Sequence, residues 1–444
     1  MLLRKLMIAA LPLLATGGYG QTTMAGRIDQ KAQALEKRLS EWRRDFHQNP
    51  ELGNREFKTA EKIASHLKQL GIEVQTGVAH TGVVGLLKGG KPGPVVALRA
   101  DIDALPVTER VDVPFKSTVI TEFNGQKTGV MHACGHDTHI AILMGVAEVL
   151  SSMKNDLSGT VKFIFQPAEE GAPEGEEGGA LLMVKQGVLE NPKVDAIFGL
   201  HIDSQIEVGK IGYKPGPTMA AVDILNITVK GKQTHGAYPW SGIDPIVTSA
   251  QIINSLQTIV SRNLNLTQAP AVVTIGMING GIRQNIIPES VKMVGTIRTF
   301  DEKMHTFVHK RINDIATNVA ESAGAAAEVK IDILYPVTVN DVPLTENMIG
   351  TLQSVAGKEN VNLISAKTGA EDFSYYQQKV PGLFFFLGGM PKGKNVADAA
   401  PHHTPDFYLD EGSLVLGVRS LSRLTTDYME KNKTGTEKGK TKTK

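Results

Sequence analysis

The chain has 444 residues, enough for two or three domains. With 41% hydrophobic and 21% charged residues it has the composition of a globular protein. Its net charge of +1 gives no indication of nucleic acid or an anionic membrane as the main partner. Beyond the N-terminal segment, no stretch is apolar for long enough to predict a membrane span.

The first 20 residues differ from the rest of the chain. A basic start over residues 1–5 precedes a short apolar run over 6–15, and small residues then offer a cleavage site after Gly20. This pattern predicts a signal peptide over 1–20 and an exported protein, periplasmic or secreted. No cysteine follows the apolar run, so we expect no lipid anchor. A buried N-terminal helix is the alternative.

Helical and strand-like segments alternate through residues 22–213. The apolar spacing predicts helices over 27–46, 56–70, 140–150 and 181–187, and strands over 82–87, 94–99, 159–165 and 194–200. Such alternation predicts an α/β domain with a mostly parallel sheet flanked by helices.

The pattern changes near Pro215. Residues 222–229 alternate between apolar and polar, as in a sheet with one solvated face. Helices over 244–262 and 303–323 and strands over 271–276, 290–298 and 327–334 are also predicted. A helix over 346–358 and an apolar strand over 382–388 then restore the first pattern. The predicted domains are therefore an α/β catalytic domain (22–213 and 335–430), a smaller lid-like α+β insert (214–334) and a disordered lysine-rich tail (431–444).

One segment, residues 129–139, contains the only cysteine, Cys134, and three of the twelve histidines. Cys134 and His136 are separated by one glycine and can bind one metal ion from a loop. Within a helix, residues i and i+2 would point about 200° apart. Asp137 and Thr138 carry an N-cap signal, so we expect the following helix to begin there.

Carboxylates and imidazoles follow the predicted strands, at the sheet edge where α/β proteins bind ligands. They are Asp101 and Asp103, Glu169 and Glu170, His201, and His402 and His403. Together with Cys134, these side chains offer more donors than one tetrahedral ion requires. A donor set of this size suits two divalent ions. The mixed donors favour zinc, with manganese, cobalt or nickel as alternatives. Adjacent Glu169 and Glu170 point apart, so one can bind metal while the other acts as a general base.

These segments resemble the di-metal aminoacylase/carboxypeptidase superfamily, in the branch of hippurate hydrolase, N-acyl-amino-acid amidohydrolases and indole-acetyl-amino-acid hydrolases. The resemblance runs in order through 27–430, over the blocks 44–53, 98–106, 131–139, 166–171, 231–239, 285–288, 295–298 and 369–373. It implies a homodimeric hydrolase, joined through the inserted domain, that cleaves the amide bond of a small N-acyl amino acid or short peptide.

The resemblance also implies roles for individual residues. The metal ligands would be Cys134, His136, Glu170, His201 and His403, with Cys134 bridging two ions. His403 is preferred over His402 because the motif His-x-Pro-x-Phe matches 403–407. Glu169 would be the general base, and His235 would reach the partner's active site to steady the oxyanion. Arg298 and Asn285 would hold the substrate's carboxylate, and Asp101 would orient a ligand.

Several alternatives remain open at this point. The acidic segment 172–179 is longer than the resemblance leads us to expect, and we interpret it as a solvated loop rather than a specificity element. Rival functions are a dipeptidase of the same superfamily, a cysteine hydrolase using Cys134, and a metal- or ligand-binding protein without activity. Six further residues are interpreted as structural, capping or surface residues and are not assigned to the site: His132, His139, His305, His309, Glu371 and Asp372.

Overall fold

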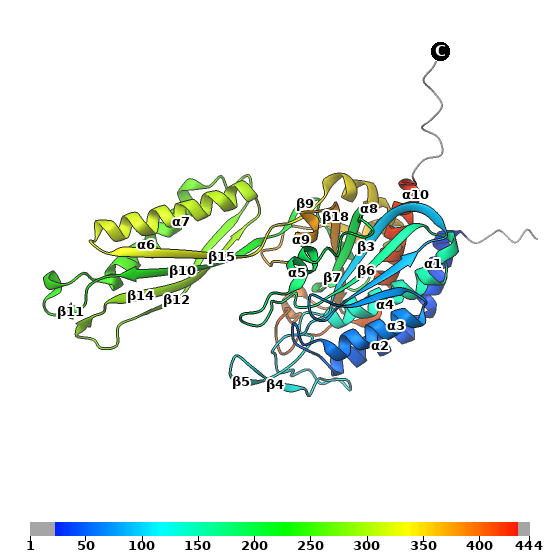
Figure 1. Cartoon of the computed structure of the whole chain (residues 1–444), viewed down its shortest axis with the longest axis horizontal. Coiled ribbons are helices and arrows are strands. Elements are labelled where there is room, and N and C mark those ends of the chain that lie inside the picture. Colours follow the sequence, from blue (N-terminus) through cyan, green and yellow to red (C-terminus); the bar gives the residue numbers. More distant parts are fainter. Residues whose placement is uncertain (1–22, 434–444) are drawn as a thin grey trace, which may run out of the picture.

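The computed structural model describes residues 23–433. The predicted signal peptide and residues 434–444 of the predicted tail lie outside this range. Figure 1 shows a large domain that holds both ends of the described chain and a narrower inserted domain that extends to one side. Within residues 23–433, no helix combines the length and apolar character needed to cross a membrane.

The large domain is built on an eight-stranded sheet with the order β1-β2-β6-β3-β7-β18-β8-β17. These strands are β1 (Glu73–Val78), β2 (Gly82–Lys88), β6 (Ser158–Gln166), β3 (Lys91–Asp101), β7 (Ala196–Glu207), β18 (Gly382–Met390), β8 (Ile211–Tyr213) and β17 (Val361–Leu363). The four long central strands, β6, β3, β7 and β18, are parallel, whereas β1 and β2 are antiparallel to their neighbours. The predicted, mostly parallel α/β sheet is confirmed.

Helices cover both faces of this sheet. One face packs against α1 (Met24–Ala34), α2 (Glu36–Gln48), α3 (Phe57–Gln69), α4 (His136–Ser151), α8 (Val342–Ala356) and α10 (Leu414–Lys431). The other packs against α5 (Gly179–Lys185) and α9 (Ser374–Gln377). Along β18, Phe385 joins the first core while Phe384 and Phe386 join the second, because successive side chains of a strand point to opposite faces.

The single helix expected over 27–46 is in fact two helices. Leu35 separates α1 from α2, and its N–H bonds to the carbonyl of Ala32, three residues back. Neither glycine nor proline marks this break in the sequence. The first helix begins at Met24, where the Thr23 side chain caps it.

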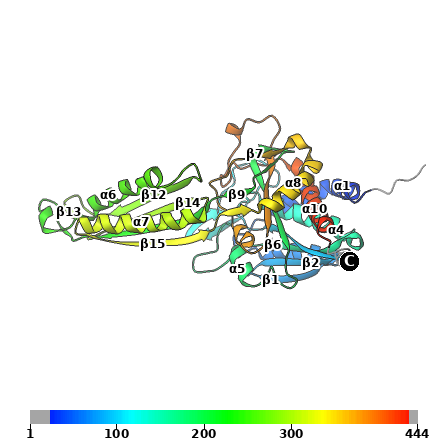
Figure 2. The ribbon, with the colours of Figure 1, turned by 90° about the horizontal axis from the view of Figure 1, so that it is seen from above.

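The inserted domain has a four-stranded antiparallel sheet with the order β12-β14-β10-β15. Its elements are β10 (Ala221–Lys230), β12 (Ala271–Gly280), β14 (Ser290–Thr299), β15 (Ala326–Tyr335), α6 (Pro245–Thr258) and α7 (Glu302–Ser322). Both helices pack on one face over a separate core, and Asp244 and Asp301 cap them. The expected α+β insert with four strands and two helices is confirmed (Figure 2).

Short paired strands complete the two domains. In the large domain, β4 (Ile120–Phe123) and β5 (Gln126–Gly129) form a hairpin. Near the domain junction, β9 (Gly216–Met219) pairs with β16 (Thr338–Asn340). At the end of the inserted domain farthest from the large sheet, β11 (Thr234–His235) pairs with β13 (Ile286–Ile287) (Figures 1 and 2).

Candidate metal centre and active site

The start of α4 places the two central candidates. Gly135 caps the helix at φ 93°, and a Cβ there would lie 2.4 Å from the Ile202 side chain, so the position requires glycine. Cys134 therefore lies in the loop, and His136 is the first residue of the helix. The N-cap expected at Asp137 is wrong. This buried carboxylate instead lies 2.8 Å from both Arg43 Nε and His47 Nδ1.

A first cluster of metal-ligand atoms joins Cys134, His136 and His201. His136 donates from Nδ1 to the carbonyl of Asp103 at 2.9 Å, which leaves Nε2 buried without a hydrogen-bond partner. His201 donates from Nδ1 to the carbonyl of Ile202 at 2.6 Å, and its Nε2 lies 3.4 Å from Cys134 Sγ. Because Nδ1 carries the proton in both rings, both Nε2 atoms have lone pairs free for a metal ion.

A second cluster joins Cys134, Glu170 and His403. His403 Nε2 lies 3.2 Å from Cys134 Sγ and 3.0 Å from Glu170 Oε1. The His403 backbone has φ 63°, an unfavourable value for a residue with a Cβ, and its N–H is held by the carbonyl of Ala133. The two clusters share one thiol, so the donors fit two ions bridged by Cys134.

The hydrogen-bond partners of His402 differ from those of its neighbour His403. His402 donates from Nδ1 to the carbonyl of Cys134 at 3.1 Å, and its Nε2 accepts the N–H of Ser204 at 3.2 Å. Both of its ring nitrogens therefore bind backbone groups. The geometry agrees with the preference for His403 as the ligand.

We expect His403→Gln to lower the metal content of the purified protein by about one ion per chain, because the second cluster loses a donor. His402→Gln is expected to keep the full metal content and to lower the free energy of unfolding by about 1–3 kcal/mol, since it leaves buried backbone groups unpaired. Elemental analysis and denaturant unfolding of both variants check this. A larger metal loss in His402→Gln would reverse the assignment.

Three buried residues behind the clusters hold the ligands in place. His139 donates from Nδ1 to Asp101 at 2.5 Å and accepts the N–H of Ile202 at Nε2 at 2.8 Å, so neither nitrogen is free for metal. Asp101 is 3.8 Å from His136 Nε2, so its direct partners are His139 and Arg99 rather than a candidate ligand. Asp103, one of the carboxylates that follow the predicted strands, orients both neighbours: its Oδ1 lies near His136 Nδ1, and its Oδ2 accepts the N–H of Glu170 at 2.9 Å.

A fully buried arginine forms ion pairs with three carboxylates near the candidate base, Glu169. Arg99 lies 2.6 Å from Asp101, 2.9 Å from Glu371 and 2.8 Å from Asp372. Glu371 and Asp372 therefore belong to the support of the site. Burial, and then the charges of Glu371 and its other acidic neighbours, raise the pKa of Glu169 well above its usual value. A carboxyl group with a raised pKa is suited to accepting and returning a proton near neutral pH.

A cavity of about 310 Å³ opens beside Glu170. Leu52, Phe123 of the β4–β5 hairpin and Pro173 of the acidic segment are among its lining residues. The acidic segment is anchored on this side, because Glu176 lies 2.6 Å from the guanidinium of Arg55. Part of the loop that we expected to be solvated thus forms the rim of the site.

The remaining predicted site residues lie in the inserted domain. His235 is exposed on β11, and the carbonyl of Asn285 accepts the N–H of Gly236 at 2.8 Å, so the two residues are neighbours. Strand β11, which carries His235, lies at the end of the inserted domain farthest from the large sheet (Figure 1), and Asn285 directly precedes its partner strand β13. Arg298 is half-buried on β14, and burial lowers its pKa. Within one chain, the structure does not bring His235 and Asn285 to the metal ligands.

Two donor clusters that share a thiol, with the buried carboxyl of Glu169 beside them, are the arrangement of a metal-dependent hydrolase. The comparisons agree with this class, since residues 97–427 match the model described as peptidase family M20/M25/M40. The chain belongs to this family.

Relatives with assigned names are similar over most of their length. Thermostable carboxypeptidase 2 of Saccharolobus solfataricus is 41% identical, with 89% of this chain and 97% of the relative covered. N-acetyl-L-cysteine deacetylase of Bacillus subtilis is 39% identical, with 86% of each chain covered. The crystal structure of Bacillus subtilis YXEP, described as a dinuclear metal binding peptidase from the M20 family, has a TM-score of 0.74 at 37% identity. It covers 90% of this chain and 99% of its own.

Proposed function

We propose that this hydrolase cleaves the amide bond of N-acyl amino acids or short peptides with a free carboxylate. The observation that carries the proposal is the pair of donor clusters sharing Cys134 next to buried Glu169. Cys134, His136 and His201 would hold one divalent ion, and Cys134, Glu170 and His403 the other. Bound ions of this kind supply Lewis-acid activation of water and of the carbonyl. Zinc suits the donors best, with manganese, cobalt and nickel as alternatives.

Glu169 performs the proton transfers in this proposal. Its ionised carboxylate removes one proton from the attacking water as the new C–O bond forms. The same carboxyl group then donates that proton to the amine nitrogen as the C–N bond breaks, so it is regenerated after each turnover. The raised pKa of Glu169 favours the first step, because it makes the carboxylate a stronger base toward the attacking water.

The substrate class rests on the basic and amide side chains proposed to bind its carboxylate, Arg298 and Asn285. We expect N-acetyl and N-benzoyl amino acids to be hydrolysed with kcat/KM at least about 10²-fold above that of the corresponding amino acid amides. The loss of one charge-assisted bidentate contact is of this size. Steady-state kinetics on matched acids and amides measure the ratio. Equal kcat/KM values would remove carboxylate recognition from the proposal without affecting the hydrolytic mechanism.

We also propose a homodimer through the inserted domain. Exposed apolar side chains gather on this domain: Ile246 and Val247 of α6 are 43% and 55% exposed, and Ile278 of β12 is 50% exposed. Ile282, in the loop after β12, is 97% exposed. β12 is also an edge strand of its sheet. An apolar surface beside an open edge strand favours pairing with a second copy.

In this dimer, His235 would complete the active site of the partner chain. His235→Ala is expected to lower kcat by about 10²–10³-fold, the usual cost of losing one oxyanion donor. Mixing His235→Ala chains with Glu169→Gln chains should then restore activity. In the mixed dimer, one site pairs an intact Glu169 with the intact His235 of the other chain.

Refolding the two inactive variants together and assaying hydrolysis tests this arrangement. Each variant refolded with itself is the control and should stay inactive. If the mixture is no more active than these controls, His235 does not act across the dimer.

A further inference from the structure

A third group of metal-ligand side chains lies outside the active site, where the inserted domain meets the large domain. Asp223 projects from β10, and His305 and His309 project from α7. Both Nε2 atoms lie 2.7 Å from the same oxygen, Asp223 Oδ2. The imidazole ring centroids are 4.1 Å apart.

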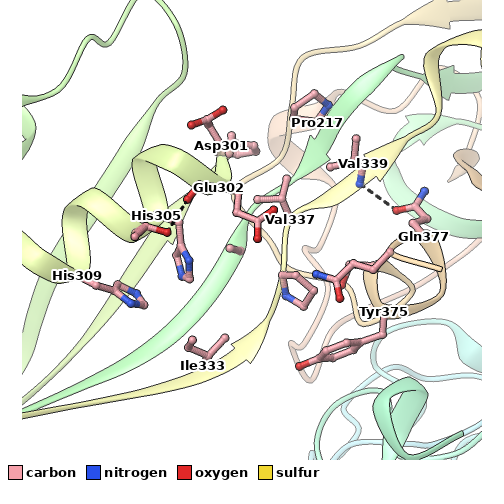
Figure 3. Close-up of a pocket in the computed structure, with 16 residues that line it drawn as sticks. Pro217, Asp301, Glu302, His305, His309, Ile333, Val337, Val339, Tyr375 and Gln377 are labelled. Carbon is pink, nitrogen blue, oxygen red and sulfur yellow. Dashed lines mark hydrogen bonds between the residues drawn. The ribbon is translucent and has the colours of Figure 1, made fainter. Parts of the chain in front are cut away.

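The spacing of the two histidines explains this convergence. Residues i and i+4 share one face of a helix, so His305 and His309 point the same way from adjacent turns. Figure 3 shows both imidazoles side by side at the edge of a cavity. Two imidazoles and one carboxylate form the three-residue set that binds zinc with a fourth position left open.

The hydrogen bonds within this group leave one buried carboxylate oxygen without a partner. The Asp223 side chain is fully buried, and its second oxygen, Oδ1, has no hydrogen-bond partner. Buried carboxylate oxygens are rarely left unpaired, because the lost hydration costs about 1–3 kcal/mol or more. Burial would raise the pKa of Asp223, but the N–H groups of His305 and His309 outweigh burial and lower it. The group therefore holds a buried anionic carboxylate, of which one oxygen is bonded by both imidazoles and the other has no partner.

The surroundings give an ion both access and room. The cavity is about 610 Å³, and residues of both domains line it, including His305 and Ile333 on one side and Val337, Tyr375 and Gln377 on the other (Figure 3). The two imidazoles are 14% and 20% exposed. Tetrahedral zinc separates neighbouring donor atoms by about 3.3 Å, so the present 2.7 Å contacts must widen by about 0.6 Å. Imidazoles that border a cavity can move this far, and the proton now on each Nε2 must pass to Nδ1 or to solvent so that Nε2 can bind the ion.

We propose that Asp223, His305 and His309 form a third metal site in each chain, for a first-row divalent ion and zinc in particular. Its fourth position faces the cavity between the domains. The ion would link α7 to β10 next to the junction between the two domains. The site shares no residue with the two clusters around Cys134, so its occupancy does not depend on the hydrolytic mechanism.

Zinc content measured on the full-length protein tests the proposal. Wild type, His305→Gln/His309→Gln and the control His80→Gln are dialysed against zinc-buffered solution and analysed for metal. His80 is exposed, belongs to none of the three groups and hydrogen-bonds to the backbone carbonyl of Glu177, so it serves as the control for surface histidine binding. We expect three zinc ions per chain in wild type and in the control, and two in the double variant. Equal zinc content in wild type and the double variant would overturn the proposal.

A second measurement reports on the site itself and does not require removal of both histidines. Cobalt is added to protein whose catalytic sites already hold zinc, and the visible absorption of tetrahedral cobalt is recorded. We expect a band in wild type that weakens at least about tenfold in Asp223→Asn, which keeps the side-chain size but removes the charge. An unchanged band would place the cobalt elsewhere and overturn the assignment.

Discussion

Glu169→Gln is expected to lower kcat by roughly 10²–10⁴-fold, the usual contribution of a positioned general acid–base group. The amide keeps the size of the side chain but can neither take a proton from water nor return one to the amine. Glu169 is not needed for either metal cluster, because the two triads are complete without it. The metal content should therefore equal that of wild type.

Glu176→Gln is the matched control for this substitution. Glu176 lies seven positions along the chain, on the rim of the same site, but its carboxylate pairs with Arg55 rather than facing the metal ligands. Its kcat should stay within about twofold of wild type, the effect of a surface ion pair being small. If Glu169→Gln turned over at the wild-type rate with full metal, another group would have to be the base.

Cys134→Ser is the second substitution with a large expected effect. Cys134 is the only residue common to both ligand triads, so the change weakens both sites together. Changes in residues that merely orient ligands cost 10–100-fold in metal affinity, and loss of a shared thiolate should cost more than about 100-fold. We expect the purified variant to contain less than one ion per chain and to be inactive, as measured by elemental analysis and hydrolysis assays.

Chelation distinguishes this account from a cysteine nucleophile. Burial, and then the carboxylates of Glu170 and Glu169, raise the pKa of the Cys134 thiol well above its usual value. A nucleophilic cysteine needs the opposite shift. Wild type should lose activity on treatment with a chelator and regain it when divalent metal is restored. Full activity in the chelated enzyme would favour Cys134 as the nucleophile instead.

The sequence predicted those parts of the fold that depend on local pattern. Strands such as β18, bounded by Pro381 and Pro391, and the alternating β10 were recognisable from their own residues. The break at Leu35 was not recognisable, because it results from packing of α1 and α2 on the same core and no helix breaker marks it.

The candidate ligands could be selected for a related reason, since each follows a buried strand or precedes a buried helix. Their supports were harder to find. Arg99 bonds to Asp372 across 273 residues, and no local signal in the chain connects the two. Asp372 resembled a helix cap, and it does accept the N–H of Ala180, but at the start of α5 rather than of the helix that follows it in sequence. His305 and His309 likewise resembled surface residues in the sequence, because nothing local indicates that both contact Asp223 of β10 in the fold.

Anomalous X-ray diffraction at the zinc edge, from crystals grown with zinc, tests the central claim most directly. Around Cys134 we expect two peaks, one on each side of its Sγ, in addition to the separate peak proposed at Asp223, His305 and His309. One peak should lie next to His136 and His201, and the other next to Glu170 and His403. Fewer than two peaks next to Cys134, whatever is found at Asp223, would contradict a two-metal site that shares this thiol in this hydrolase.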